Sequence, residues 1–176
     1  MREIISSIEA EYRRYKVLGE GAIRQTREDE LSKSLSTNGN AIAVIVWHIS
    51  GNLKSRFTDF LMSDGEKPWR KRDSEFEPRM GVTFTKLWER WDEGWAVLFS
   101  VLQSLSDADL SRTVTIRGVA FRVHEALHRL LAHTSYHVGQ IVYLAKTFRG
   151  SEWKTLSIPL GRSEEYNRNP TFEKFG

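Results

Sequence analysis

Cysteine is absent from this chain of 176 residues. Without cysteine there is no disulfide, no thiolate zinc site and no cysteine nucleophile. Any metal ion bound by the chain must therefore be held by histidine or carboxylate side chains. The same absence agrees with a reducing compartment, and we expect a cytoplasmic protein.

Long apolar runs are also absent. No stretch approaches the ~20 consecutive apolar residues that a membrane-spanning helix needs. The charged start Met1-Arg2-Glu3 leads into an amphipathic segment, which is unlike a signal peptide. We expect no membrane partner. The length suits one domain with its own hydrophobic core, so we predict a single domain over residues 1–176.

Neither sign of charge is in large excess, because 26 Lys and Arg residues against 23 Asp and Glu residues give a net charge of +3. The densest basic stretch is Lys67-Pro68-Trp69-Arg70-Lys71-Arg72, which has acidic residues on both sides. A basic patch can bind nucleic acid, but flanking acids favour a solvated loop. We interpret the stretch as such a loop and do not expect nucleic acid as a partner.

Apolar residues recur with the period of a helix in four segments of the chain. These segments cover residues 5–22, about 41–62, 84–105 and about 124–148. Good N-cap residue types at 36–38 precede the second segment. In the third, Trp88, Trp91 and Trp95 follow steps of three and four residues, which is typical of a seam between helices. We assign this seam to the core rather than to a dimer face.

Two further segments do not follow the helical period. Residues 113–116 and 119–121 on either side of Arg117-Gly118 predict a short hairpin. After Gly150 the period ends, and residues 157–161 must be extended or turning. The chain is therefore predicted to be all-α: an antiparallel four-helix bundle with a short hairpin before the last helix and an irregular C-terminal tail.

Four of the five histidines lie on the last predicted helix, as the pairs His124/His128 and His133/His137. Residues four apart lie one turn apart on the same face of a helix, which suits a shared metal ion. At ~100° per residue, the apolar side of this helix lies nearly opposite His124 and His128, while His133 and His137 lie on its shoulder. Only the second pair therefore leans towards the core.

The fifth histidine, His48, lies at the edge of the apolar stripe of the second predicted helix. We predict that His48, His133 and His137 form an open three-histidine site for a divalent metal, with Zn or Ni favoured. Asn52 and Gln140, each near one of these histidines, could hold an imidazole tautomer or a bound water. The alternative is that the histidines are buried residues satisfied by hydrogen bonds to Tyr or Ser.

The first pair also spells H-E-x-x-H, the zinc-protease motif, in which Glu125 would be the general base. Glu152, Glu164 or Glu165 could in principle supply a third ligand. Position 134, where a metzincin has its third histidine, is Thr, and the pair points away from the core. We interpret the match as accidental and keep the protease only as an alternative.

Trp47-His48-Ile49-Ser50-Gly51-Asn52 and the segment from His133 to Ile141 together resemble the DinB/YfiT-like superfamily. Residues 153–159 and 163–167 further resemble an uncharacterised branch of it, a domain-of-unknown-function family. The resemblance implies an up-down-down-up bundle, often a homodimer, with one divalent ion on residues that correspond to His48, His133 and His137. Relatives include metal-dependent transferases that use low-molecular-weight thiols, and a thiol-dependent maleylpyruvate isomerase.

Two functions follow as expectations. The first is a metal-dependent enzyme, a thiol S-transferase or a hydrolase, in which the metal lowers the pKa of a thiol or water and a small molecule is the substrate. Tyr136, Arg117 and Arg162 are candidate substrate contacts. The second is a non-catalytic dimeric helical bundle that acts as a binding or stress-related module.

Overall fold

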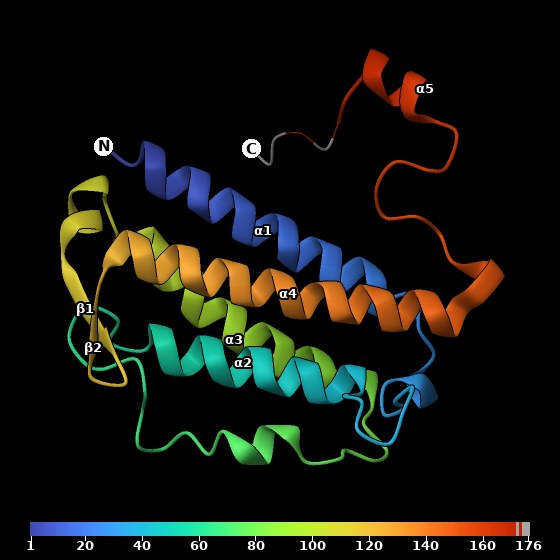
Figure 1. The fold of residues 1–176 in the computed structure, drawn as a ribbon, viewed down its shortest axis with the longest axis horizontal. Helices are drawn as coiled ribbons and strands as arrows, with labels where there is room; N and C mark the ends of the chain where they lie inside the picture. Colours follow the sequence, from blue (N-terminus) through green and yellow to red (C-terminus); the bar gives the residue numbers. More distant parts are fainter. Residues whose placement is uncertain (172, 174–176) are drawn as a thin grey trace.

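The computed structural model describes residues 1–171 and 173, and this part of the chain is mainly helical (Figure 1). Its α-helices are α1 (Glu3–Ile23), α2 (Ile42–Phe57), α3 (Phe84–Ser104), α4 (Val123–Arg149) and α5 (Ser163–Arg168). A hairpin of β1 (Thr113–Ile116) and β2 (Val119–Arg122) precedes α4. The prediction of a mainly helical fold with a short hairpin is confirmed. No described helix is both long enough and apolar enough to cross a membrane.

The four long helices lie side by side, with α1 and α4 running in one direction and α2 and α3 in the other (Figure 1). The opposite direction of α1 and α3 is visible in their contacts. Arg2 donates to the carbonyl of Leu102 near the end of α3, whereas Lys16, later in α1, pairs with Asp92. The long connection 58–83 leads from the end of α2 back to the side on which α2 begins, so α2 and α3 are parallel. This is the up-down-down-up order expected above.

The apolar stripes of the four long helices meet in one core. Tyr12, Trp91 and Trp95 are fully buried there, and the Tyr12 hydroxyl donates to the carbonyl of Leu127. The tryptophan seam therefore belongs to the core, as predicted. Close packing of α2 against α3 depends on Gly94, because a Cβ at this position would lie 2.7 Å from the Cα of Ser50.

Helix α2 begins close to the predicted start but ends earlier than predicted. It begins at Ile42 with Ala41 as N-cap, so the polar residues 36–38 do not cap it. The free N–H of Ala43 donates instead to the carbonyl of Leu31, 2.9 Å away. The helix ends at Phe57 and not at Met62, because Thr58 is extended and Asp59 adopts a positive φ of 49°.

The hairpin turns through Arg117 and Gly118, whose φ angles of 55° and 73° match the two-residue turn that suits the twist of paired strands. Strand β1 pairs antiparallel with β2, with Val114 opposite Phe121. The chain beyond Gly150 is irregular over residues 157–161, as predicted, but it also contains the short helix α5, which was not predicted. Figure 1 shows α5 standing away from the four long helices.

Candidate metal site

Three imidazoles from two helices converge on one point, and His48, His133 and His137 are called the histidine cluster below. The Nε2 atom of His133 lies 3.2 Å from Nε2 of His48 and 3.2 Å from Nε2 of His137. One ring nitrogen from each residue lies within 4.8 Å of the other two. His48 and His137 are 3% and 7% exposed, while His133 is half-buried. The three residues selected from the sequence are thus brought together.

The other ring nitrogens of His48 and His137 are held by oxygen acceptors. Nδ1 of His48 lies 2.9 Å from a carboxylate oxygen of Glu75, and Nδ1 of His137 lies 2.9 Å from Oε1 of Gln140. Because both partners accept, both Nδ1 atoms carry the proton in the neutral ring. The Nε2 atoms of His48 and His137 therefore present lone pairs towards His133.

This arrangement leaves the cluster short of protons. A neutral His133 can place at most one proton on Nε2, and this proton can satisfy only one of the two lone pairs that face it. At least one contact of 3.2 Å is then between two nitrogen lone pairs. A divalent cation at the centre would accept all three lone pairs. Two nitrogens bound to zinc at tetrahedral angles lie about 3.3 Å apart, so the observed separations fit a metal ion.

Burial keeps the rings of His133 and His137 uncharged. Desolvation, together with the proximity of His137 and His48, lowers the pKa of His133 to about 3. Desolvation also lowers the pKa of His137, although the hydrogen bond to Gln140 acts in the opposite direction. Metal ligation needs the unprotonated imidazole, so both rings are in the binding form at neutral pH.

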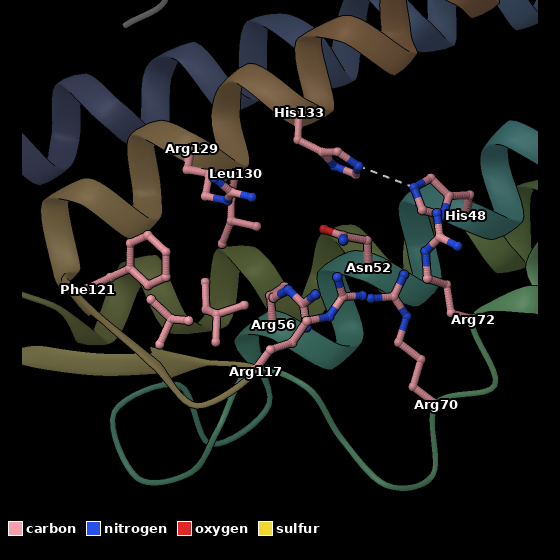
Figure 2. A pocket seen from close by; sticks show the side chains of 12 residues that line it. His48, Asn52, Arg56, Arg70, Arg72, Arg117, Phe121, Arg129, Leu130 and His133 are labelled. Carbon is pink, nitrogen blue, oxygen red and sulfur yellow. Dashed lines mark hydrogen bonds between the residues drawn. The ribbon is translucent and has the colours of Figure 1, made fainter.

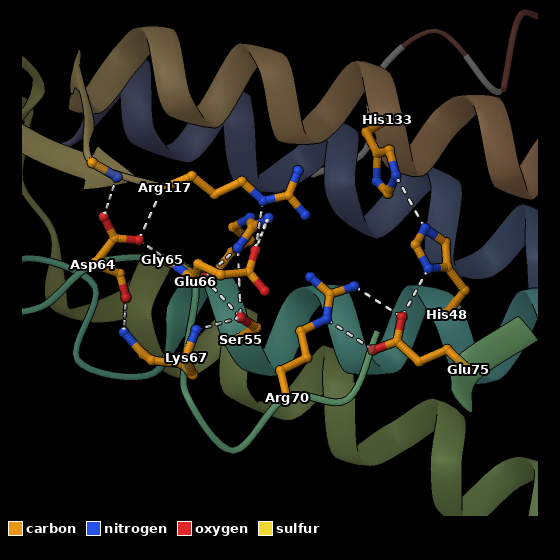
Figure 3. Close-up of polar contacts among 12 residues, drawn as sticks. His48, Ser55, Asp64, Gly65, Glu66, Lys67, Arg70, Glu75, Arg117 and His133 are labelled. Carbon is orange, nitrogen blue, oxygen red and sulfur yellow. Dashed lines mark hydrogen bonds and ion pairs between the residues drawn. The ribbon is translucent and has the colours of Figure 1, made fainter. Parts of the chain in front are cut away.

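Glu75 was not identified from the sequence, although it is the carboxylate that orients His48 (Figure 3). It lies in a 3₁₀ turn, Asp73–Phe76, of the connection between α2 and α3. It accepts from Nε and Nη2 of Arg70 at 2.8 and 2.9 Å and is 5% exposed. Burial acts to raise the pKa of Glu75, but the hydrogen bonds from Arg70 and His48 outweigh it and lower the pKa. The carboxylate is therefore charged beside His48.

Glycine at position 51 makes room for this carboxylate. A Cβ on Gly51 would lie 2.1 Å from Oε1 of Glu75, which is far below any real contact distance. Gly51 follows His48 by three residues on α2, so the helix presents the imidazole and the gap for its partner on neighbouring turns. The presence of glycine within a buried helix is the one sequence signal that could have indicated a close approach here.

The basic stretch 67–72 is only partly the solvated loop that we predicted, because residues 68, 69, 71 and 72 are exposed but Lys67 and Arg70 are not. The Arg70 side chain is only 2% exposed because it pairs with Glu75, and Lys67 is 7% exposed. The ammonium group of Lys67 donates to the hydroxyl of Ser63 and to the carbonyl of Asp64. The interpretation was wrong for these two residues because the stretch folds back along α2 instead of extending into solvent.

Asn52 lines a cavity of about 450 Å³ together with His48 and His133 of the cluster and with residues of α2, the connection 58–83, the hairpin and α4 (Figure 2). The Oδ1 atom of Asn52 is buried and has no hydrogen-bond partner among the described residues. No hydrogen bond joins Asn52 to a histidine in that part of the chain. Its free oxygen is placed to accept a hydrogen bond from a molecule in the cavity.

The three candidate substrate contacts lie in different places. Arg117 lines the cavity beside the histidine cluster. Tyr136 is 62% exposed, and its ring centre lies 4.7 Å from that of His137, outside the cavity lining. Arg162 lies in the C-terminal region, where it pairs with Glu165, and does not line the cavity either. Only Arg117 is positioned as a contact of this site.

The H-E-x-x-H pair has a structural explanation. His124 and His128 are exposed, and Nδ1 of His124 contacts the carbonyl of Leu110. The Glu125 carboxylate accepts from the backbone N–H of Arg122 at 2.7 Å, which satisfies a free donor at the start of α4. Over residues 1–171 and 173, the only group of three metal-ligating side chains found is the histidine cluster. The motif lacks the geometry of a zinc protease.

Comparison with known proteins gives a family but no individual relative. A family model described as "Protein of unknown function (DUF1572)" matches residues 1–162, which include every residue of the histidine cluster and its partners. No curated protein and no solved structure matches the chain.

Proposed function

The chain belongs to the DUF1572 family, and we propose that it binds one divalent metal ion on His48, His133 and His137 and acts on a small molecule in the adjoining cavity. The observation that carries the proposal is the convergence of three Nε2 atoms that together hold too few protons to satisfy one another. A set of three neutral imidazoles suits zinc or nickel and leaves coordination positions free.

We further propose that the fold is the four-helix bundle of the DinB/YfiT-like superfamily, formed by a single domain over residues 1–176. The support is the up-down-down-up order of α1 to α4 and the positions of His48 on α2 and of His133 and His137 on α4. The superfamily places its divalent ion on residues that correspond to these three. A homodimer and a cytoplasmic location stay predictions from the resemblance and the composition.

The proposed chemistry is thiol S-transfer to an electrophile or hydrolysis, with a low-molecular-weight thiol as a candidate cosubstrate. A bound divalent ion would lower the pKa of a thiol or of water, which provides a nucleophile at neutral pH. Glu75 fixes the tautomer of His48, and Gln140 fixes that of His137. The free Oδ1 of Asn52 would accept a proton-bearing group of the substrate or nucleophile. Leu130 and Phe121 add apolar groups to the cavity wall.

Metal analysis tests the site. Purified protein is stripped with a chelator, loaded with Zn²⁺ or Ni²⁺, freed of excess metal and analysed by elemental mass spectrometry. We expect one ion per chain in the wild type and in His124→Ala, and none in His137→Ala. Metal lost only from His124→Ala would contradict the proposal and support the protease. A wild type without affinity for either ion would favour the non-catalytic binding module.

Catalysis is tested on the loaded protein with a panel of low-molecular-weight thiols and the electrophile monobromobimane. A rate above the uncatalysed reaction that disappears with a chelator and in His137→Ala supports the transferase. A loaded protein that accelerates no thiol reaction but hydrolyses a chromogenic ester in a chelator-sensitive manner supports the hydrolase instead.

A further inference from the structure

The wall of the cavity beside the histidine cluster is unusually rich in arginine. Five of its twelve lining residues are arginines, contributed by α2, the connection 58–83, the hairpin and α4, and they are called the arginine wall below: Arg56, Arg70, Arg72, Arg117 and Arg129. Figure 2 shows these side chains gathered around the space below His133. The remaining lining residues carry no acidic group.

The positive charges of the arginine wall are only partly compensated. Arg56 and Arg117 share a single carboxylate oxygen of Glu66, at 3.0 and 2.8 Å. Arg70 pairs with Glu75, and Arg72 lies 3.5 Å from a carboxylate oxygen of its neighbour Asp73. Three carboxylates thus serve four arginines, and the cavity keeps an excess of positive charge.

Arg129 has no carboxylate partner in the part of the chain that the structure describes. Its guanidinium lies 5.8 Å from the ring centre of Phe121, and the residue is exposed at the cavity rim on α4. One turn further along α4 stands His133, so Arg129 and the histidine cluster face the same cavity.

A second unpaired donor lies deeper in the wall. Nε and Nη2 of Arg70 are used by Glu75, but Nη1 is buried and has no partner among residues 1–171 and 173. Figure 3 shows this nitrogen pointing away from Glu75. A buried N–H without an acceptor is costly, and an acceptor oxygen supplied from the cavity would remove this cost. The unpartnered Nη1 of a side chain that is 2% exposed therefore points to an oxygen-bearing ligand.

We infer that the substrate is a small molecule with a carboxylate or phosphate group, and that this oxyanion binds to the arginine wall while the remainder of the molecule reaches the histidine cluster. Only the part that places the molecule at the histidine cluster rests on the proposed function. Guanidinium groups bind both kinds of oxyanion through paired N–H donors, so the two share one recognition chemistry. A cavity of about 450 Å³ is within the range of small-molecule sites. A divalent ion on three neutral imidazoles would add further positive charge, which also favours an anion.

Calorimetric titration with inorganic phosphate, succinate and the uncharged analogue succinamide tests this inference, on both metal-loaded and chelator-stripped protein. We expect at least one anion to bind the wild type and succinamide not to bind. Arg129→Gln should weaken the binding about tenfold, because one charge-assisted contact is lost. Arg129→Lys should weaken it less. The control Arg24→Gln changes an exposed arginine just after α1, outside the cavity, and should have no effect.

The outcomes separate the two proposals. Preference for phosphate or for succinate assigns the oxyanion to a phosphate or a carboxylate, and either preference supports the inference. Anion binding that depends on Arg129 in a protein that takes up no metal would refute the proposed function and leave the inference standing. If neither anion binds the wild type, or if Arg129→Gln and the double variant with Arg117→Gln bind as tightly as the wild type, the inference is overturned.

Discussion

Replacement of Gly51 by alanine should weaken metal binding although position 51 offers no ligand atom. The new Cβ would lie 2.1 Å from Oε1 and 2.7 Å from Cδ of Glu75. Carbon and oxygen atoms make ordinary contact at about 3.4 Å, so the carboxylate must move by more than about 1 Å. Hydrogen bonds of 2.8 to 2.9 Å to Arg70 and His48 do not survive such a displacement.

The size of the effect follows from the role of Glu75 at His48. Loss of a partner that orients a metal-ligating histidine weakens metal affinity about 10- to 100-fold, which corresponds to about 1.4 to 2.8 kcal/mol. Alanine is favoured over glycine within a helix by about 0.5 to 1 kcal/mol, which offsets only part of the stability lost when Glu75 moves away from Arg70. The affinity is measured by competition between stripped protein and a chromophoric chelator for Zn²⁺.

Gly139 provides the matched control, because it also lies in a helix near the cluster but a Cβ there would meet nothing within 4 Å. Gly139→Ala should leave zinc affinity unchanged and should stabilise the protein by up to about 1 kcal/mol. If Gly51→Ala binds zinc as tightly as the wild type and Gly139→Ala do, Glu75 does not support the metal site through His48.

Three further predictions concern the same structure. Glu75→Gln should lower zinc affinity about 10- to 100-fold, since the amide can donate to Nδ1 of His48 and so move the ring proton to Nε2. The control Glu66→Gln also weakens contacts to two arginines, but it should leave zinc affinity within about twofold in the same titration. The metal-free protein should lose stability as the pH falls from about 6.5 towards 3, because the lowered pKa of His133 lets the unfolded chain bind a proton that the folded chain does not. In urea unfolding, the free energy of unfolding of His133→Ala should fall less with pH than that of the wild type, with a difference under about 1.4 kcal/mol per pH unit because the ring is partly exposed. Equal losses in the two proteins would contradict this. Leu98→Ala in the core should lower the free energy of unfolding by about 2 to 5 kcal/mol in the same assay. Val17→Ala, at a half-exposed position, should change it by about 0.5 kcal/mol or less. A small effect at Leu98 would argue against the described core.

The histidine cluster could be predicted from the sequence because helical periodicity fixes the direction of each side chain. On α4 the angle between His124 and His133 separates an outward pair from an inward pair, and the exposed positions of His124 and His128 confirm this separation. His48 at the edge of the apolar stripe of α2 was the remaining element, since an edge position can reach a neighbouring helix.

The partners of the cluster could not be predicted to the same degree. Gln140 lies on the same helix as His137, so its hydrogen bond follows from spacing alone. Glu75 is separated from His48 by 27 residues and lies in a connection without periodicity, so its contact depends on how that connection folds back along α2. The same path buries Arg70, whose charge indicated a solvent-exposed position as long as its partner was unknown.

The end of α2 shows a second limit of pattern reasoning. Phe60 is buried, as its place in the apolar stripe predicted, yet it is not part of the helix, because the backbone leaves the helical region at Thr58. The hydrophobic pattern therefore indicates that Phe60 is buried, but it does not indicate where the helix ends.

An anomalous difference map from crystals of the zinc-loaded protein, recorded at the zinc edge, would show where the ion binds. We expect one strong peak between the Nε2 atoms of His48, His133 and His137, about 2.0 to 2.1 Å from each. A peak beside His124 and His128, or an unoccupied cluster in crystals of protein shown to contain zinc, would contradict it.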